Sequence, residues 1–265
     1  MSKILIRDIV ALLEEAFPPT WQEDFDNTGL QIGEEIRPCT GVLLCVDATP
    51  EVVVEAYEKG CNLIISHHPL IFHPIKRITS MGRVDRTIYK AIKNDIAIYS
   101  CHTSVDNAPG IGVSWQMGRM MGMTDMSTLE GHDDDEIGAG IIGRLQQPLE
   151  AEALVALVKS TFSSPIVRCS SLDFVRGRIE RVALCGGAGS FLLPKAIEAG
   201  AQAFIASDCK HNHFIDHLGQ IFLVDLGHYE AEACTKRIFY QIIREKIPNF
   251  ALYYSELETN PIIYL

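Results

Sequence analysis

Apolar and polar positions along the chain predict helices and strands in alternation. Residues 1–17, MSKILIRDIVALLEEAF, place apolar side chains at helical spacing between charged ones, which is typical of an amphipathic helix. Short apolar runs then follow at 41–46, 62–66 and 96–100. These runs favour covered strands of a parallel sheet, because they are short and are bounded by turn residues.

The stretch between the first two runs has the start and stop signals of a helix. Thr49 stands at the N-cap, Pro50 at the first helical position and Gly60 just past the end. The spacing predicts a second helix over residues 84–94, before the third strand. The segment therefore reads as strand, helix, strand, helix, strand, which is the pattern of an α/β fold.

The same order of elements recurs later in the chain. Residues 181–213, RVALCGGAGSFLLPKAIEAGAQAFIASDCKHNH, repeat the arrangement of residues 41–68, GVLLCVDATPEVVVEAYEKGCNLIISHH. An apolar run at 219–226 supplies the equivalent of the third strand. We therefore expect two related α/β domains that face each other across a shared cleft.

Candidate chemistry begins where the strand at 62–66 ends, at His67 and His68, which precede Pro69. Open α/β sheets bind ligands at the carboxyl ends of their strands. Neighbouring side chains on a strand point to opposite faces, so both imidazoles can meet one site only if the chain leaves strand geometry at Ser66. The competing interpretation is that His67 caps the strand and His68 is an ordinary, partly buried histidine.

Two further His–acid pairs share one spacing. His102 and Asp106 follow the third strand, and His228 and Glu232 follow its counterpart, each pair with three residues between. On a helix starting near residue 229, with an apolar face over 233–243, His228 and Glu232 would lie one turn apart on one face, as two metal ligands must. An ordinary cap and a first-turn acidic residue would give the same spacing.

Together these positions offer enough ligands for two divalent cations. Imidazoles and carboxylates without thiolates suit Zn, Fe, Mn or Ni and do not decide among them. Two such ions activate a bridging water and stabilise the oxyanion formed when it attacks. His102 is either a further ligand or a partner that orients one. The predicted ligands are His67, His68, Asp106, His228 and Glu232.

Three other segments carry polar or glycine-rich motifs with two interpretations each. Asp26 and Asn27 either orient a ligand or satisfy turn backbone. Residues 185–189, CGGAG, either cradle a phosphate or form a tight turn. In the segment 208–213, Lys210, His211 and His213 either line the cleft or are surface residues, and the charge run at 132–136 is interpreted as a solvated loop.

Composition narrows the class of protein. The net charge of -11 over 265 residues makes binding to nucleic acid an unlikely role, because that needs clustered Lys and Arg. The eight cysteines form no CxxC pair and are typical of a reducing compartment. The N-terminal segment lacks the apolar core of a secretory signal, and no stretch approaches a membrane span. We therefore expect a cytoplasmic protein.

The sequence resembles the NIF-three-like family, whose bacterial members are often labelled GTP cyclohydrolase 1 type 2 homologues. The resemblance covers nearly the whole chain and rests on ordered blocks, namely DNTGLQIG, SHHPLIF, HTSVDNAPGIG, GIIGRL, CGGAGS, SDCKHNH, GHYEAE and TNPIIYL. In that family the matching residues bind a dinuclear metal centre, and these fall on His67, His68, Asp106, His228 and Glu232. Asn212 between two histidines, and Ala231 before the glutamate, depart from the family pattern.

The resemblance also implies an architecture. It implies mixed sheets and a second α/β domain inserted into the first, with the metal site in the cleft between them. We expect the first domain to span 1–125 plus 222–265 and the inserted domain to span 126–221. The family further implies a toroidal homohexamer.

The leading hypothesis is a dinuclear metal-dependent hydrolase that acts on a small, anionic or nucleotide-like substrate. The family label implies attack of an activated water on C8 of the guanine ring of GTP, with loss of formate. No catalytic residue beyond the metal ligands is assigned. The alternative hypothesis is a metal-binding regulatory or metal-chaperone protein without turnover.

Overall fold

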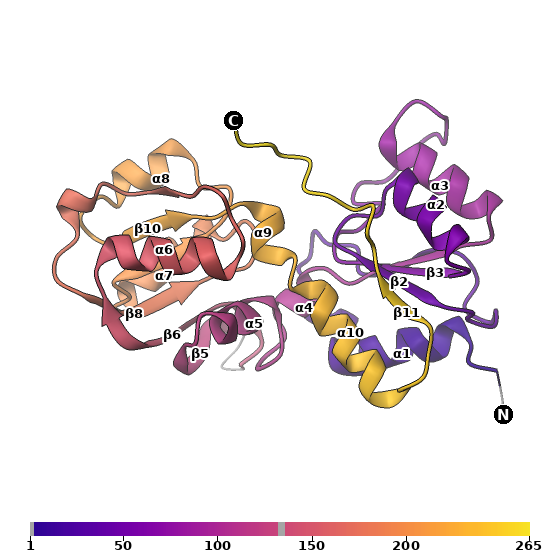
Figure 1. Ribbon diagram of the computed structural model, residues 1–265, viewed down its shortest axis with the longest axis horizontal. Coiled ribbons are helices and arrows are strands. Elements are labelled where there is room, and N and C mark those ends of the chain that lie inside the picture. Colours follow the sequence, from indigo (N-terminus) through magenta and orange to yellow (C-terminus); the bar gives the residue numbers. More distant parts are fainter. Residues whose placement is uncertain (1–2, 132–135) are drawn as a thin grey trace. The chain divides into compact units, whose positions relative to one another are not determined.

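The computed structural model describes residues 3–131 and 136–265, so most of the charge run predicted to be a loop lies outside the described residues. The chain packs as two compact units (Figure 1). Unit 1 consists of Met1–Val105 and Thr235–Thr259, and unit 2 consists of Asp106–Cys234 and Asn260–Leu265. Unit 2 therefore interrupts unit 1 in sequence, while the predicted boundaries near residues 125 and 222 stay a prediction.

Unit 1 is built on a mixed sheet of five strands in the order β1-β4-β3-β2-β11. The strands β4, β3, β2 and β11 run parallel, and β1 pairs antiparallel with β4 at one edge. The parallel strands predicted from the apolar runs are confirmed, each within one or two residues of its expected ends. The bounds are β1 Gly29–Ile32, β2 Val42–Cys45, β3 Leu63–Ser66, β4 Ala97–Ser100 and β11 Leu252–Tyr254.

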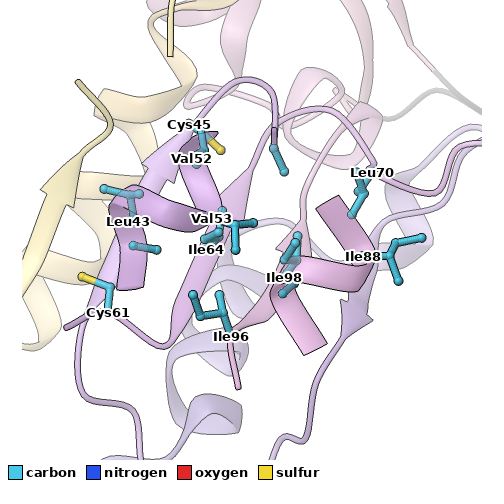
Figure 2. Packing of buried hydrophobic residues seen from close by; sticks show 13 residues of the cluster. Leu43, Cys45, Val52, Val53, Cys61, Ile64, Leu70, Ile88, Ile96 and Ile98 are labelled. Atoms are coloured by element: carbon cyan, nitrogen blue, oxygen red, sulfur yellow. The ribbon is translucent and has the colours of Figure 1, made fainter. Parts of the chain in front are cut away.

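Four helices cover the two faces of this sheet. Helices α1 and α10 lie side by side on one face, and α2 and α3 pack together on the other (Figure 1). Figure 2 shows the core beneath α2 and α3, where Val52, Val53 and Ile88 meet Leu43, Ile64 and Ile98 of the sheet. The bounds are α1 Ile6–Ala16, α2 Pro50–Glu58, α3 Arg83–Lys93 and α10 Thr235–Lys246, with a short 3-10 turn at Pro19–Trp21.

The predicted start signals of α2 are confirmed in the structure. The Thr49 hydroxyl oxygen accepts a hydrogen bond from the Val52 amide at 3.2 Å, and Pro50 opens the helix. Gly60 has a φ of 70°, a conformation that glycine adopts without a steric penalty. This turn delivers the chain to β3, which ends beside the two histidines.

Unit 2 is built on a mixed sheet of six strands in the order β5-β6-β8-β9-β10-β7. Its central strands β8, β9 and β10 run parallel, whereas β5, β6 and β7 are antiparallel to their neighbours. The bounds are β5 Thr124–Gly131, β6 Gly138–Leu149, β7 Arg168–Cys169, β8 Ile179–Leu184, β9 Ala203–Ala206 and β10 Phe222–Asp225. The parallel trio corresponds to β2, β3 and β4, so the repeat predicted from the sequence is confirmed.

Short helices and turns connect these strands. Buried residues of α7, including Leu193 and Ala196, form a core with Phe204 and Leu223 of the sheet. Helix α5 packs against β6. The bounds are α4 Thr103–Asp106, α5 Val113–Met120, α6 Ala151–Thr161, α7 Leu193–Glu198, α8 His211–Asp216 and α9 His228–Glu232, with 3-10 turns at Leu172–Phe174 and Ser190–Leu192.

The helix expected from residue 229 through 243 is not continuous. It divides at Ala233 and Cys234 into the short α9 and the longer α10. The break lies where the chain passes from unit 2 to unit 1. Cys234 is the last residue of the first segment of unit 2, and Thr235 is the first residue of the second segment of unit 1. No Gly or Pro marks this point, so the apolar spacing could not reveal it.

Two compositional expectations can be compared with the structure. All eight cysteines, each within the described ranges, are free thiols, and seven of them are buried. Across residues 3–131 and 136–265, no helix combines the length and the apolar character needed to span a bilayer.

Candidate metal centre

Three imidazoles gather at the carboxyl end of the unit 1 sheet. His67 and His68 follow β3 directly, and His102 follows the neighbouring parallel strand β4. The ring centroids lie 5.0 Å apart for His67 and His68, 5.2 Å for His67 and His102, and 5.5 Å for His68 and His102. One nitrogen of each ring lies within 4.8 Å of the others, which is the spacing of ligands around a common cation.

The chain leaves strand geometry at Ser66, as two histidines sharing one site require. β3 ends at this residue, and the Ser66 hydroxyl donates a hydrogen bond to the His68 carbonyl oxygen at 2.9 Å. The same hydroxyl lies 2.9 Å from the hydroxyl of Ser100, which ends β4. These two buried serines fix the turn that brings adjacent side chains to one side.

Each of the three rings is oriented through its Nδ1 atom. The partner of His67 is the carbonyl oxygen of Cys101 at 3.2 Å. The partners of His68 and His102 are carboxylates, Asp47 Oδ1 at 3.2 Å and Asp26 Oδ1 at 2.8 Å. An Nδ1–H that donates to oxygen leaves Nε2 as the lone-pair atom, and metal-binding histidines are held in this way.

Asp26 is the most firmly held of these orienting groups. Its side chain is fully buried, and its second oxygen accepts hydrogen bonds from the Thr103 amide at 2.8 Å and the Thr103 hydroxyl at 2.5 Å. Burial alone would raise the pKa of Asp26, but the hydrogen bond and charge of His102, with the bonds from Thr103 and Asn27, hold it well below its usual range. Asp26 thus orients the His102 ring and also satisfies the backbone amides of Asn27 and Thr103, so both interpretations of this residue have contacts behind them.

Unit 2 carries one imidazole among carboxylates. His228 opens α9 and Glu232 ends it, and the His228 Nε2 atom lies 3.0 Å from Glu232 Oε2. The His228 Nδ1 atom lies 2.8 Å from Oδ2 of Asp208, which follows β9. Burial alone would lower the pKa of His228, but the contacts with Glu232 and Asp208 raise it to about 9.

The carboxylate of Asp106 influences the same two cysteines of unit 2 as the carboxylate of Glu232. Asp106 ends the one-turn helix α4 and is half buried. Burial, followed by the charges of Asp106 and Glu232, raises the pKa of the Cys234 thiol to about 12, and the same causes raise the pKa of Cys185. Two carboxylates that affect the same two thiols lie in one electrostatic neighbourhood, together with His228.

The CGGAG turn serves close packing around this cluster. Gly187 has a φ of 67°, and a Cβ built on it would overlap the Glu232 Oε1 atom. A Cβ on Gly186 would come within 2.6 Å of Val113, and the Gly186 amide donates to the Ser114 hydroxyl at 3.1 Å. The turn interpretation of these glycines therefore has direct support, and Gly187 allows the Glu232 carboxylate to lie against the backbone.

In residues 210–213, the described hydrogen bonds are local ones. The Lys210 amide donates to His213 Nδ1 at 3.1 Å, so His213 caps the start of α8, and His211 is exposed. Asp47, in contrast, had no role in the sequence interpretation, although it lies only two residues before the helix cap at Thr49. Asp47 directly follows the apolar run at 41–46, as His67 follows the run at 62–66. This position was the signal that could have identified Asp47.

Fold and site together define a class, namely a two-unit α/β protein with histidine and carboxylate clusters of metal-binding type at the ends of parallel strands. The chain belongs to the Duf34/NIF3 (NGG1p interacting factor 3) family, whose model matches residues 4–261. The resemblance found in the sequence is thereby confirmed.

Relatives and solved structures agree with this membership. A protein of Lactococcus lactis named GTP cyclohydrolase 1 type 2 homolog is 33% identical over 262 residues, covering 97% of this chain and 98% of the relative. A Clostridium perfringens protein of the same name is 32% identical, covering 86% of each chain. A crystal structure of a hypothetical protein of Staphylococcus aureus matches with a TM-score of 0.91, 28% identity and full coverage of both chains. A Bacillus cereus protein related to NIF3 shares the fold, with a TM-score of 0.89, 24% identity and full coverage of both chains.

Proposed function

We propose that this protein is a dinuclear metal-dependent hydrolase and that His67, His68, Asp106, His228 and Glu232 hold two divalent ions per subunit. The observation that carries the proposal is the state of the imidazoles. His67, His68, His102 and His228 each have Nδ1 in contact with an oxygen of their own unit, which is how metal-binding histidines are held. The same arrangement at four imidazoles, each following a parallel strand by a few residues, supports a shared role in metal binding.

The donor set fits divalent transition metals. It consists of imidazole nitrogens and carboxylate oxygens, the ligand types that suit Zn, Fe, Mn and Ni. Two such ions would supply a water of lowered pKa as the nucleophile and would stabilise negative charge that develops on the substrate. His102 stands among the unit 1 ligand atoms, so we include it as a sixth candidate ligand.

The residues of the chain itself have orienting and charge-balancing roles in this proposal. Asp26, Asp47 and the Cys101 carbonyl fix the rings of unit 1, and Asp208 fixes the ring of His228. Their Nδ1–H bonds keep each imidazole in the tautomer that binds metal through Nε2. Asp106 and Glu232 supply the negative charge that partly neutralises the two cations.

The relatives named GTP cyclohydrolase 1 type 2 homolog point to a nucleotide as the substrate class. We extend this to the present chain as a small, anionic, nucleotide-like substrate with a bond that water can attack. We further propose a cytoplasmic homohexamer, as the family resemblance implies. Size-exclusion chromatography with light scattering tests the subunit count, and a dimer or monomer would contradict it.

The decisive experiment combines metal analysis with turnover. Protein purified without added metal is analysed for its elements and, after loading with Zn, Mn or Fe, is assayed on GTP, other nucleotides and phosphoesters. We expect close to two ions per chain and turnover of at least one nucleotide. His68→Ala should abolish turnover and lower metal content with the oligomer intact, whereas His73→Ala, an exposed histidine of the same loop, should change neither.

The alternative, a metal-binding regulatory or metal-chaperone protein, predicts another outcome of the same experiment. Metal would bind tightly and exchange with a chelator, but no substrate of the panel would be turned over. That result would overturn the hydrolase assignment and leave the ligand assignment in place. Absence of metal binding would overturn both.

A further inference from the structure

Unit 2 contains a cavity that is lined in part by His228 and Asp208 and that extends beyond the proposed metal ligands. Its volume is about 280 Å³, slightly below the roughly 300–1,000 Å³ typical of sites for drug-sized ligands. Every residue that lines it belongs to unit 2. It lies at the carboxyl ends of β9 and β10, where α/β sheets bind ligands.

The walls of this cavity are mainly apolar. Ile166 and Val167 precede β7, Leu226 follows β10, and Ile262 and Tyr264 come from the C-terminal segment. Flat apolar walls with few polar groups favour a compact ring over a flexible charged chain.

The polar lining consists of one cation and two carboxylates besides His228. Arg168 donates through Nε and Nη2 to the buried Asp225 and through Nη2 to the Cys209 carbonyl, so the described bonds leave its Nη1 group for a ligand. Asp208 contacts His228 through Oδ2, which leaves Oδ1 as a second acceptor. A donor and an acceptor in one cavity suit an uncharged amide edge, because a carboxylate would leave the Asp208 oxygen without a proton to accept.

The wall formed by the C-terminal segment is held in place by α9. The Asn260 side chain donates to Glu230 Oε1 at 2.9 Å and accepts from the Ile262 amide at 3.0 Å. Gly227 lacks a Cβ that would overlap Glu230 and come within 2.9 Å of the Tyr264 hydroxyl. The segment that closes the cavity is therefore attached to the same helix that carries His228.

We propose that this cavity binds an uncharged planar ring with a carbonyl or amide edge, and that it is the subsite which presents the substrate to His228. The ring lies between Ile166, Leu226 and Tyr264, its carbonyl oxygen accepts from Arg168 Nη1, and its N–H donates to Asp208 Oδ1. Ring binding itself needs no metal. The role as a substrate subsite rests on the proposed hydrolase function.

Fluorine NMR of 4-fluorobenzamide with the full-length protein tests this proposal, with 4-fluorobenzoate as the anionic counterpart. We expect line broadening of the amide at millimolar concentration and weaker broadening of the benzoate. Ile166→Trp should fill the cavity and weaken amide binding by about tenfold or more, which corresponds to the loss of one well-packed ring. Ile215→Trp, at another exposed isoleucine (59% exposed, against 48% for Ile166) on α8 outside the lining, should leave binding unchanged.

The two proposals fail in distinguishable ways. Absence of amide binding, stronger binding of the benzoate, or unchanged binding in Ile166→Trp overturns the ring subsite, whatever the metal analysis gives. Amide binding without any metal content supports the cavity but overturns the hydrolase. If turnover is found, the amide should inhibit it competitively in the parent protein and about tenfold less in Ile166→Trp. Inhibition unchanged by that substitution overturns the subsite role.

Discussion

The two units assemble ligands of the same kinds in different ways. In unit 1, three imidazoles stand at the ends of parallel strands, and each is oriented from behind by a carbonyl or carboxylate. In unit 2, a single imidazole on a short helix lies between Asp208 and Glu232, with the charge of Asp106 nearby. The first arrangement groups imidazole nitrogens, whereas the second sets one imidazole among carboxylates, which raise the pKa of His228 to about 9.

The largest expected effect comes from the turn beside Glu232. In Gly187→Ala, the added Cβ overlaps the Glu232 carboxylate, and the φ of 67° becomes strained. We expect zinc affinity to fall by more than about 100-fold, beyond the loss typical of an orienting partner, because a ligand itself is displaced. Competition with a chromophoric chelator measures this.

Gly200→Ala is the matched control for backbone strain. Gly200 lies in the same unit with a φ of 74°, but nothing lies within 4 Å of an added Cβ. It should lose about 1 kcal/mol of stability without loss of zinc affinity. Equal zinc affinity in the two alanine variants would show that Glu232 does not bind the metal.

The orienting carboxylates provide the next comparison. Asp26→Asn removes a buried charge that orients His102, and Asp208→Asn removes an exposed one that orients His228. Partners of this kind contribute about 10–100-fold to metal affinity. We expect Asp26→Asn near the upper end and Asp208→Asn near the lower end, because solvent screens the exposed contact. Zinc titration of both variants measures the two losses of affinity. A larger loss in Asp208→Asn than in Asp26→Asn would contradict the expected difference between the two units.

Local sequence signals predicted the strands and the histidine cluster well. Thr49, Pro50 and Gly60 define α2 through interactions within a few residues, and such interactions are visible in a sequence. The runs ending at Ser66 and Ser100 are apolar on both faces because helices cover both sides of the sheet. His67, His68 and His102 therefore could be assigned to strand ends from the sequence.

Long-range partners could not be predicted in the same way. Asp26 and Thr103 are hydrogen-bonded although 77 positions separate them in sequence, and for Glu258 and Val46 the separation is 212 positions. No rule of sequence spacing predicts such pairs. The break between α9 and α10 depends on where the chain changes units and has no local marker. A tight turn was one of two interpretations of the segment that contains Gly187, but the contact of this glycine with Glu232 depends on tertiary packing.

Release of a proton on zinc binding would distinguish His228 from an imidazole that is already neutral before the metal binds. The His228 pKa of about 9 means that the ring is protonated at neutral pH in the metal-free protein. Since metal binds only the deprotonated ring, zinc affinity should rise by about tenfold per pH unit up to about pH 9 and then level off. Calorimetry in buffers of different ionisation enthalpy should show about one proton released at pH 7.5, absent in His228→Ala. An equal release from that variant would assign the proton elsewhere.

The smallest expected effect on zinc affinity concerns two buried glutamates of unit 1, Glu258 and Glu55. Glu258 ends the segment 255–258, and Glu55 binds the same segment. Glu258 Oε1 accepts from the amides of Val46 at 2.5 Å and Asp47 at 2.6 Å, and Oε2 accepts from Lys236 at 2.7 Å. Asp47 in turn faces His68. Glu258 therefore fixes the turn from which His68, a proposed metal ligand, is oriented.

Glu55 is the natural comparison, because its carboxylate accepts hydrogen bonds from Ser255, Glu256 and Leu257 and reaches the turn at Asp47 only indirectly, through the Ser255 hydroxyl and the Glu258 amide. Burial alone would raise the pKa of Glu55, but these bonds lower it, so its contribution to stability is present above the unfolded pKa and is lost as the pH falls through the folded value.

We expect Glu258→Gln and Glu55→Gln each to lower the free energy of unfolding at pH 7 by about 1–3 kcal/mol in urea denaturation. Only Glu258→Gln should also weaken zinc binding, by about threefold, since it alone loosens the turn that holds Asp47. In Glu55→Gln the loss of stability on acidification should be smaller than in the parent protein. Equal weakening of zinc binding by both substitutions would mean that the segment acts through general stability, and that Glu258 has no specific part in orienting His68.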